Sequence, residues 1–270
     1  MNNTEIKAQH YEEIRQLVYN KAGIALGESR QALVQARLSK RLRALSLNEF
    51  EEYIDYLRHD ESGEEIVELL DVISTNFTSF FREERHFQLL TEIVQKAVAS
   101  KSRQFRLWCA AAATGEEPYT LSMVIQEAAE GRIPDIKILA TDISTRALRA
   151  CQAGRYDEAR LKTVPESSRR RWFRKDDDEY VAMPELRAPL RFSRLNLMEV
   201  PYPMKGPFDV IFCRNVMIYF DKEGRTKFVQ QALRLLAPGG ILVVGSSESL
   251  AGIAVGMETL MPSVYRKGMA

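Results

Sequence analysis

The chain has 270 residues, which is enough for one large domain or two smaller ones with a sizeable core. Charged residues make up 28%, and the formal net charge of +1 gives no bulk attraction to nucleic acid or to a membrane surface. Three cysteines without a CxxC spacing argue against a disulfide framework and against a zinc site, so we expect no bound metal. The start of the chain lacks the apolar core of a signal peptide, and no run is long enough to cross a bilayer, so a cytoplasmic location is the simplest expectation.

The first 75 residues show helical periodicity without a convincing strand, and we predict a small all-helical N-terminal domain over 1–75. The stretch 29–48 contains five basic residues and no acidic one, whereas 48–71 contains ten acidic residues and one arginine. Such segregated charge is typical of a solvated helix face, but it also suits docking to an acidic partner. Both interpretations stay open, and the candidate docking residues are Arg30, Arg37, Lys40 and Arg41.

The segment 73–87, ISTNFTSFFREERHF, joins the helical part to the rest of the chain. It is too polar to be pure core and too aromatic to be a free linker. Taken by itself, it favours a structured interdomain segment over a site. A turn entering a helix could nevertheless bring Asn76, Thr78 and Arg82 together.

From residue 104 onward, apolar runs alternate with helical stretches, which predicts a doubly wound, mostly parallel sheet. The expected strands are 105–110, 137–141, 190–195, 208–213 and 241–244, and the expected helices are 117–130, 145–153 and 222–236. A polar insertion covers about 155–189. The tail, 257–261 and 263–267, is expected to form an antiparallel hairpin at the edge of the sheet.

Polar side chains follow the expected strands, and ligands of open α/β sheets bind outside these carboxyl ends. Asp142 follows the second strand and suits ribose hydroxyls, although an Asp there is also a common helix cap. Asn196 and Leu197 follow the third strand and suit the edge and face of an adenine. The fourth strand ends at Arg214–Asn215, with Tyr219 shortly after. Together these positions favour a nucleoside site.

The first strand and its turn, LWCAAAATGEEPY at 107–119, argue against a pyrophosphate ligand. A dinucleotide site needs the fingerprint GxGxxG, whereas this turn has Gly115 alone. Glu116 and Glu117 open the next helix, where they would repel phosphates. S-adenosylmethionine carries no phosphate and is therefore the better ligand.

Four stretches are together similar to the chemotaxis receptor glutamate O-methyltransferase (CheR) family. They are TNFTSFFRE at 75–83, LWCAAAATGEEPYTLSM at 107–123, ATDIS at 140–144 and FDVIFCRNVMIYFD at 208–221. The resemblance covers almost the whole chain. It implies a class I S-adenosylmethionine-dependent methyltransferase fold over 76–270. It also implies an enzyme that methylates glutamate side chains of methyl-accepting chemoreceptors and releases S-adenosylhomocysteine.

The resemblance also implies roles for individual residues. Tyr219 would lie beside the transferred methyl group. Our own hypothesis is that Arg82 holds a carboxylate, either the methionine tail of the cofactor or the incoming glutamate, so Arg82 and Tyr219 are the expected catalytic residues. Cofactor contacts would fall on Asn76, Thr78, Arg82, Glu117, Asp142, Asn196, Leu197, Arg214 and Asn215. The segment 75–83 thereby becomes a wall of the active site, and the basic helix would dock on an acidic receptor helix.

The insertion at 155–189 resembles a small antiparallel β-subdomain that some family members use to bind the C-terminal peptide of a receptor. The corresponding loop here, Lys175–Glu179, is acidic and contains no glycine. We therefore expect no tethering peptide to bind.

Other functions remain open at this stage. A nucleic-acid methyltransferase is faintly suggested by Asn215 and Tyr219, but the prolines of the N-P-P-Y motif are missing and the charge is near neutral. A small-molecule methyltransferase is a further alternative. A non-catalytic module that senses S-adenosylmethionine is disfavoured because every matching site residue is retained.

Overall fold

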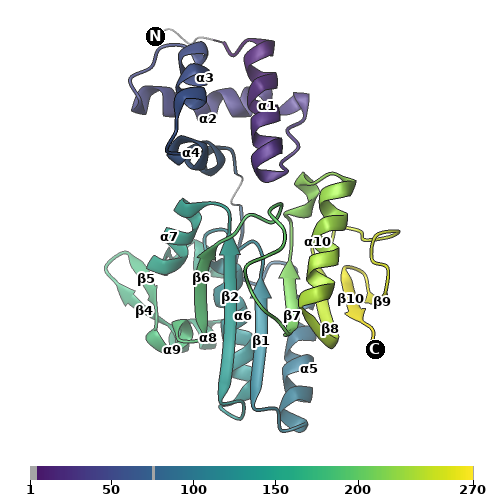
Figure 1. Ribbon diagram of the computed structural model, residues 1–270. Helices are drawn as coiled ribbons and strands as arrows, with labels where there is room; N and C mark the ends of the chain where they lie inside the picture. Colours follow the sequence, from purple (N-terminus) through teal and green to yellow (C-terminus); the bar gives the residue numbers. More distant parts are fainter. Residues whose placement is uncertain (1–4, 75–76, 270) are drawn as a thin grey trace.

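The computed structural model describes residues 5–74 and 77–269 and has two parts (Figure 1). The first is a helical bundle of α1 (Ala8–Ala22), η1 (Glu28–Arg30), α2 (Gln31–Ala44), α3 (Phe50–His59) and α4 (Glu64–Ile73). Its core contains the apolar side chains that recur at helical spacing, among them Ile14, Leu38 and Leu69. The all-helical N-terminal domain is therefore confirmed. Its boundary at residue 75 stays a prediction, because residues 75 and 76 lie outside the described residues.

The second part is built on a sheet with the strand order β6-β2-β1-β7-β8-β10-β9. Its strands are β1 (Gln104–Cys109), β2 (Asp135–Asp142), β6 (Leu190–Arg194), β7 (Phe208–Cys213), β8 (Leu236–Val244), β9 (Met257–Met261) and β10 (Val264–Lys267). Neighbouring strands from β6 to β8 pair in parallel, and the terminal hairpin β9–β10 is antiparallel. The doubly wound, mostly parallel sheet is thus confirmed.

Helices cover both faces of this sheet, because alternate residues of each strand point to opposite sides. They are α5 (Arg85–Ala99), α6 (Glu116–Ala129), α7 (Thr145–Ala153) and α10 (Lys222–Leu235). Leu107 and Phe212 belong to one core with α5 and α6, whereas Trp108 and Ile211 belong to a second core with Phe228 of α10. Because both faces of the sheet are buried, the strands are continuous hydrophobic runs in the sequence.

Two details differ from the sequence-based expectation. Helix α5 has no counterpart among the predicted elements, although Phe87, Leu90 and Val94 recur at helical spacing and are buried. The stretch 237–240, expected to be a loop after α10, lies inside β8, which begins directly after the helix. Its pairing with β7 is irregular in that region, so the proline and glycines are accommodated by a shift of register.

The insertion between α7 and β6 forms a small separate sheet with the order β3-β5-β4. It comprises β3 (Arg155–Asp157), η2 (Arg160–Thr163), α8 (Glu166–Trp172), β4 (Phe173–Asp176), β5 (Glu179–Ala182) and α9 (Pro184–Arg187). Both strand pairs are antiparallel, which confirms the expected β-subdomain. Arg155 binds the two residues that flank the β4–β5 turn, with ion pairs of 2.8 Å to Asp176 and 2.7 Å to Glu179.

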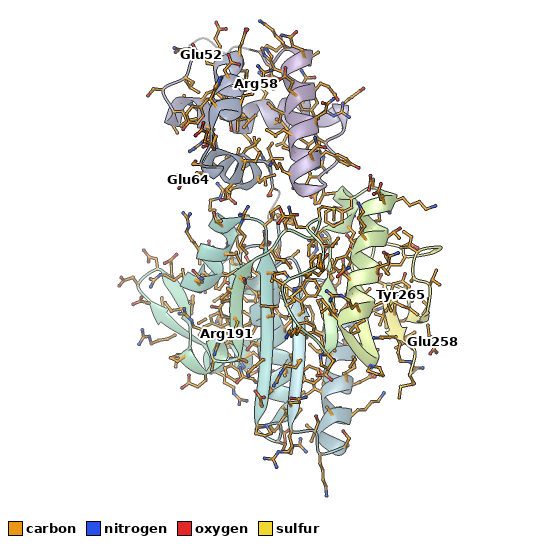
Figure 2. The ribbon with its side chains drawn as sticks, in the orientation of Figure 1. Glu52, Arg58, Glu64, Arg191, Glu258 and Tyr265 are labelled. Carbon is orange, nitrogen blue, oxygen red and sulfur yellow. The ribbon has the colours of Figure 1, made fainter. Side chains whose placement is uncertain are left out.

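The helical bundle lies over the end of the sheet toward which the parallel strands point (Figure 1). Asp71 of α4 connects the two parts: its carboxylate accepts hydrogen bonds from the Thr145 hydroxyl at 2.8 Å and the Arg146 amide at 3.1 Å. Glu52 on α3 lies on the side of the bundle that is turned away from the sheet (Figure 2). No helix within the described residues is both long and apolar enough to cross a membrane.

Candidate active site

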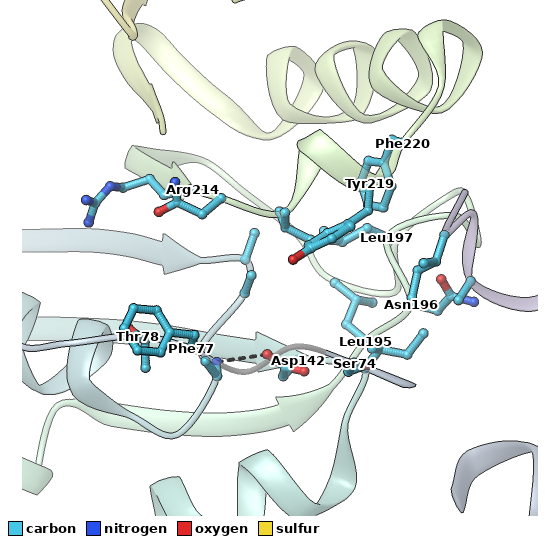
Figure 3. A pocket seen from close by; sticks show the side chains of 18 of the residues that line it. Ser74, Phe77, Thr78, Asp142, Leu195, Asn196, Leu197, Arg214, Tyr219 and Phe220 are labelled. Atoms are coloured by element: carbon cyan, nitrogen blue, oxygen red, sulfur yellow. Dashed lines mark hydrogen bonds between the residues drawn. The ribbon is translucent and has the colours of Figure 1, made fainter. Parts of the chain in front are cut away.

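A pocket opens between the ends of β1 and β7, where the strand order reverses (Figure 3). The pocket and the open space at its mouth together measure about 950 Å³. Its walls come from the bundle, from the segment before α5 and from the loops that follow β1, β2, β6 and β7. Ligands of open α/β folds bind at such a reversal point. The predicted residues that line it are Thr78, Arg82, Glu117, Asp142, Asn196, Leu197, Arg214, Asn215 and Tyr219. Asn76, also predicted as a cofactor contact, lies outside the described residues.

The loop after β1 together with the first residue of α6, residues 110–116, is termed the cofactor loop. Ala113 and Gly115 both adopt left-handed backbone conformations, with φ angles of 46° and 103°. Gly115 precedes the first turn of α6, and its conformation is the one that glycine adopts most readily. The Ala113 amide donates to the Asp142 carboxylate at 2.8 Å, so the loop is tied to the end of β2.

Asp142 is 8% exposed and accepts a second backbone hydrogen bond from Ser144 at 2.9 Å. Burial raises the pKa of its carboxyl to about 6. Ser144, rather than Asp142, is the N-cap of α7 and accepts from the Ala147 amide. Each Asp142 oxygen already accepts one backbone N–H, and the contact of Asp142 with ribose hydroxyls stays a prediction.

Glu117 and Arg214 form a buried ion pair of 2.7 Å. The Arg214 side chain is fully buried, lies 3.2 Å from the Glu83 carboxylate and donates to the Arg82 carbonyl. Burial raises the pKa of Glu117, and the Arg214 guanidinium opposes that rise. The guanidinium points away from Tyr219 (Figure 3). Glu117 and Arg214 thus fix the base of the pocket, and their direct contact with a cofactor stays a prediction.

Arg82 and Thr78 line the pocket from the segment before α5. The Arg82 guanidinium donates to the Phe77 carbonyl at 3.2 Å and is partly exposed. This places a positive charge at the pocket wall. The Phe77 ring, 81% exposed, lines the pocket beside it.

The loop after β7 is held by Glu248, which sequence reasoning missed. This carboxylate is 6% exposed and accepts three backbone hydrogen bonds, from Asn215 at 2.8 Å, Ile218 at 3.1 Å and Gly245 at 2.7 Å. Glu248 lies shortly after β8, the fifth parallel strand. A search for polar side chains after this strand end, as for the other four, would have found it. The carboxylate fixes the path of the chain from Asn215 to Tyr219, and Asn215 adopts a φ of 58° there.

The bundle closes the pocket through contacts with this loop and with the end of β6. The Arg30 guanidinium lies 4.9 Å from the centroid of the Tyr219 ring, and the Ala25 amide donates to the Tyr219 carbonyl at 2.9 Å. The Asn196 amide group donates to the Lys21 carbonyl at 2.5 Å and to Glu199 at 3.0 Å. The bond to Lys21 ties Asn196 to the bundle, and a contact of Asn196 with adenine stays a prediction.

The predicted docking residues occupy different environments. Arg30 lines the pocket, and Arg37 donates to the Ile73 carbonyl at 2.6 Å at the end of α4. Arg41 forms a charge pair with Glu65, which is 3% exposed. Arg37 and Arg41 are half-buried and bind groups of α4, whereas Lys40 is exposed. The docking role of all four residues stays a prediction.

The donor set of the pocket fits an adenosyl ligand without phosphates. Asp142 suits the ribose, Leu195 and Leu197 provide apolar surface for a base, and Arg82 suits a terminal carboxylate. Among the described residues, no group of three or more His, Cys, Asp or Glu side chains could hold a metal ion. The fold and the pocket define a class I S-adenosylmethionine-dependent methyltransferase.

Comparison with known proteins gives the family. Residues 76–264 match the model of the CheR methyltransferase SAM-binding domain, and residues 9–74 match that of the CheR methyltransferase all-alpha domain. A chemotaxis protein methyltransferase of Borreliella burgdorferi is 35% identical, over 98% of this chain and 96% of that protein. One from Salmonella typhimurium is 37% identical, over 90% of this chain and 85% of that protein. The chain belongs to the CheR methyltransferase family, and its cofactor is S-adenosylmethionine.

Proposed function

We propose that the protein methylates glutamate side chains in the cytoplasmic helices of chemoreceptors, forming 5-methyl esters. The observation that carries this proposal is the position of two guanidinium groups, Arg30 and Arg82, in the wall of the pocket that also contains Tyr219. Two positive charges at this point suit an incoming carboxylate. Relatives named chemotaxis protein methyltransferases support the same substrate class.

Bound S-adenosylmethionine supplies a methyl group on a positively charged sulfur. A glutamate carboxylate, with an ordinary pKa of about 4.3, is already ionised at neutral pH and needs no general base. One carboxylate oxygen bonds to the methyl carbon as the carbon–sulfur bond breaks, and S-adenosylhomocysteine is released. The protein's contribution is then to orient the two reactants and exclude water.

In this proposal each side chain has a defined role. Asp142 binds the ribose, and Arg82 holds either the methionine carboxylate or the target glutamate. Tyr219 lines the path of the methyl group. The bundle completes the site, since Arg30 reaches into the pocket from its own side.

The test is transfer of radiolabelled methyl groups to receptor-containing membranes. We expect label that is released as methanol by mild base, and no label on receptors whose methylated glutamates are replaced by alanine. Base-stable label on nucleic acid or on a small molecule would contradict the proposed substrate. Tight binding of S-adenosylhomocysteine without transfer to any receptor would instead indicate a non-catalytic sensing module.

The acidic hairpin of the insertion supports a second part of the proposal, that no receptor tether binds there. Asp176 and Glu179 are already paired with Arg155. Calorimetric titration with peptides from receptor C-termini should show no binding. A micromolar complex would overturn this expectation.

A further inference from the structure

The cofactor loop adopts a backbone conformation that needs support from outside the loop. Ala113 has a left-handed φ of 46°, which costs an L-residue about 1 kcal/mol or more. Gly115, two residues on, is left-handed as well. A loop with this geometry stays in one conformation when neighbouring elements hold it.

Part of that support comes from the inserted subdomain. The Tyr156 hydroxyl on β3 donates to the Thr114 carbonyl at 3.0 Å, and the Tyr156 ring is 1% exposed. A Cβ atom added to Gly115 would lie 2.4 Å from this hydroxyl. The glycine therefore also provides the space through which Tyr156 reaches the loop.

Arg160 of the same subdomain makes a second contact with the loop. Its guanidinium lies 3.0 Å from the Glu116 carboxylate and 3.4 Å from the Thr114 hydroxyl, which itself donates to Glu116 at 2.7 Å. Glu116 is 2% exposed. Among the described residues, Glu117 lines the pocket, whereas Glu116 does not. The Arg160–Glu116 pair therefore supports the loop from the side of the insertion.

We propose that the inserted subdomain positions the cofactor loop, with Tyr156 and Arg160 as positioning residues for cofactor binding. This inference rests on the assignment of the pocket in the proposed function. It gives the subdomain a role that is independent of any receptor tether: its folded state sets the conformation of residues 113–116, and hence the affinity for S-adenosylmethionine.

The experiment measures S-adenosylhomocysteine binding by calorimetry, thermal unfolding, and the kinetics of methyl transfer for five variants. Arg160→Ala and Tyr156→Phe should each weaken binding by about five- to tenfold, the loss expected for one hydrogen bond or ion pair to the loop. The KM for S-adenosylmethionine should rise with them, while the KM for receptor should not change. Arg160→Lys should recover most of the affinity.

Arg155→Ala is the matched control, because Arg155 lies in the same subdomain and pairs with Asp176 and Glu179. It should leave cofactor affinity unchanged. An equal loss in Arg155→Ala would overturn the inference, since general destabilisation of the subdomain would then explain the effect. If Arg160→Ala fails to fold, Tyr156→Phe, which removes a single hydroxyl, carries the test.

Cofactor binding by Asp142→Asn distinguishes a failure of this inference from a failure of the proposed cofactor site. Wild-type affinity in Arg160→Ala and Tyr156→Phe, together with weakened binding in Asp142→Asn, would overturn the role of the subdomain and leave the site intact. Wild-type affinity in all three variants would overturn the assignment of the pocket itself.

Discussion

The guanidinium of Arg30 lies over the ring of Tyr219, with its central carbon 4.9 Å from the ring centroid. The two residues are far apart in the sequence and belong to different parts of the molecule, so the contact makes the helical bundle a wall of the pocket. A cation over an aromatic face both attracts the ring and limits its rotation. Arg30 therefore holds Tyr219 in the position from which it would orient the methyl acceptor.

Replacing Arg30 by alanine should lower kcat for methyl transfer by about three- to fivefold, which corresponds to one cation–π contact. Binding of S-adenosylhomocysteine should change by less than about twofold, since the contact is to Tyr219. Arg30→Lys should retain part of the rate. A wild-type kcat in Arg30→Ala would contradict this role.

Arg82 should have a much larger effect. If its guanidinium holds a carboxylate in the pocket, Arg82→Ala removes a charge-assisted contact and should lower kcat/KM by about two orders of magnitude. Its hydrogen bond to the Phe77 carbonyl is partly exposed, so thermal unfolding should stay close to that of the wild type. Full activity in this variant would rule out the assigned role.

Cofactor binding should depend on pH through Asp142. Burial raises the pKa of this carboxyl to about 6, above its ordinary value. In the proposed function, the ribose hydroxyls would bind its ionised form. In the ligand-free protein the raised pKa favours the folded state at low pH, and this contribution is lost as the pH rises through about 6. Cofactor affinity should change in the opposite direction.

Calorimetry between pH 5 and 8 checks this prediction. At pH 5, one unit below the pKa, affinity for S-adenosylhomocysteine should be about tenfold lower than at neutral pH. Asp142→Asn should bind weakly at all pH values and lack the pH dependence. A flat profile for the wild type would show that ionisation of Asp142 is not required.

Local patterns were enough to predict most strands and helices of the large sheet, but not helix α5 or the start of β8. Helix α7 and strand β7 have the predicted bounds, 145–153 and 208–213, because their apolar periodicity and flanking turn residues lie in one short stretch. The strand-end rule likewise brought Asp142 and Tyr219 to one pocket. These features depend on short-range patterns and on one topological rule.

The pairing of charges could not be predicted in this way. Arg214 meets Glu117, 97 residues away, and the basic residue Arg41 is held by Glu65 of the acidic stretch. Segregation of charge along the sequence was therefore partly an internal pairing of α2 with α4. Such contacts depend on tertiary packing, which periodicity does not encode.

Glu248 should contribute to both stability and rate. In Glu248→Gln the amide nitrogen faces a backbone N–H, so at least one of three buried donors loses its acceptor, at a cost of about 1–3 kcal/mol. Urea unfolding should show this loss, and kcat should fall because the loop to Tyr219 is less fixed. Glu258→Gln is the matched control: its pair with Arg266 is exposed, so stability should change by less than about 1 kcal/mol.

Receptor docking is best tested at Lys40, because this side chain is exposed whereas Arg37 and Arg41 on the same helix bind groups of α4. Charge reversal at Arg41 would leave the buried Glu65 without its partner and destabilise the bundle, so a raised KM there would have two explanations. Lys40 is exposed, and Lys40→Glu should leave thermal unfolding unchanged. If α2 docks on an acidic receptor helix, this variant should raise the KM for receptor by about three- to tenfold at low salt.

The effect should shrink as salt is added, because exposed charges are screened over about 10 Å at 0.1 M salt. Lys96→Glu makes the same charge change on α5, at the opposite end of the molecule from the bundle (Figure 1). Its KM for receptor should match that of the wild type. Equal KM values for Lys40→Glu and the wild type at every salt concentration would contradict docking through α2 and indicate that its basic side is a solvated surface.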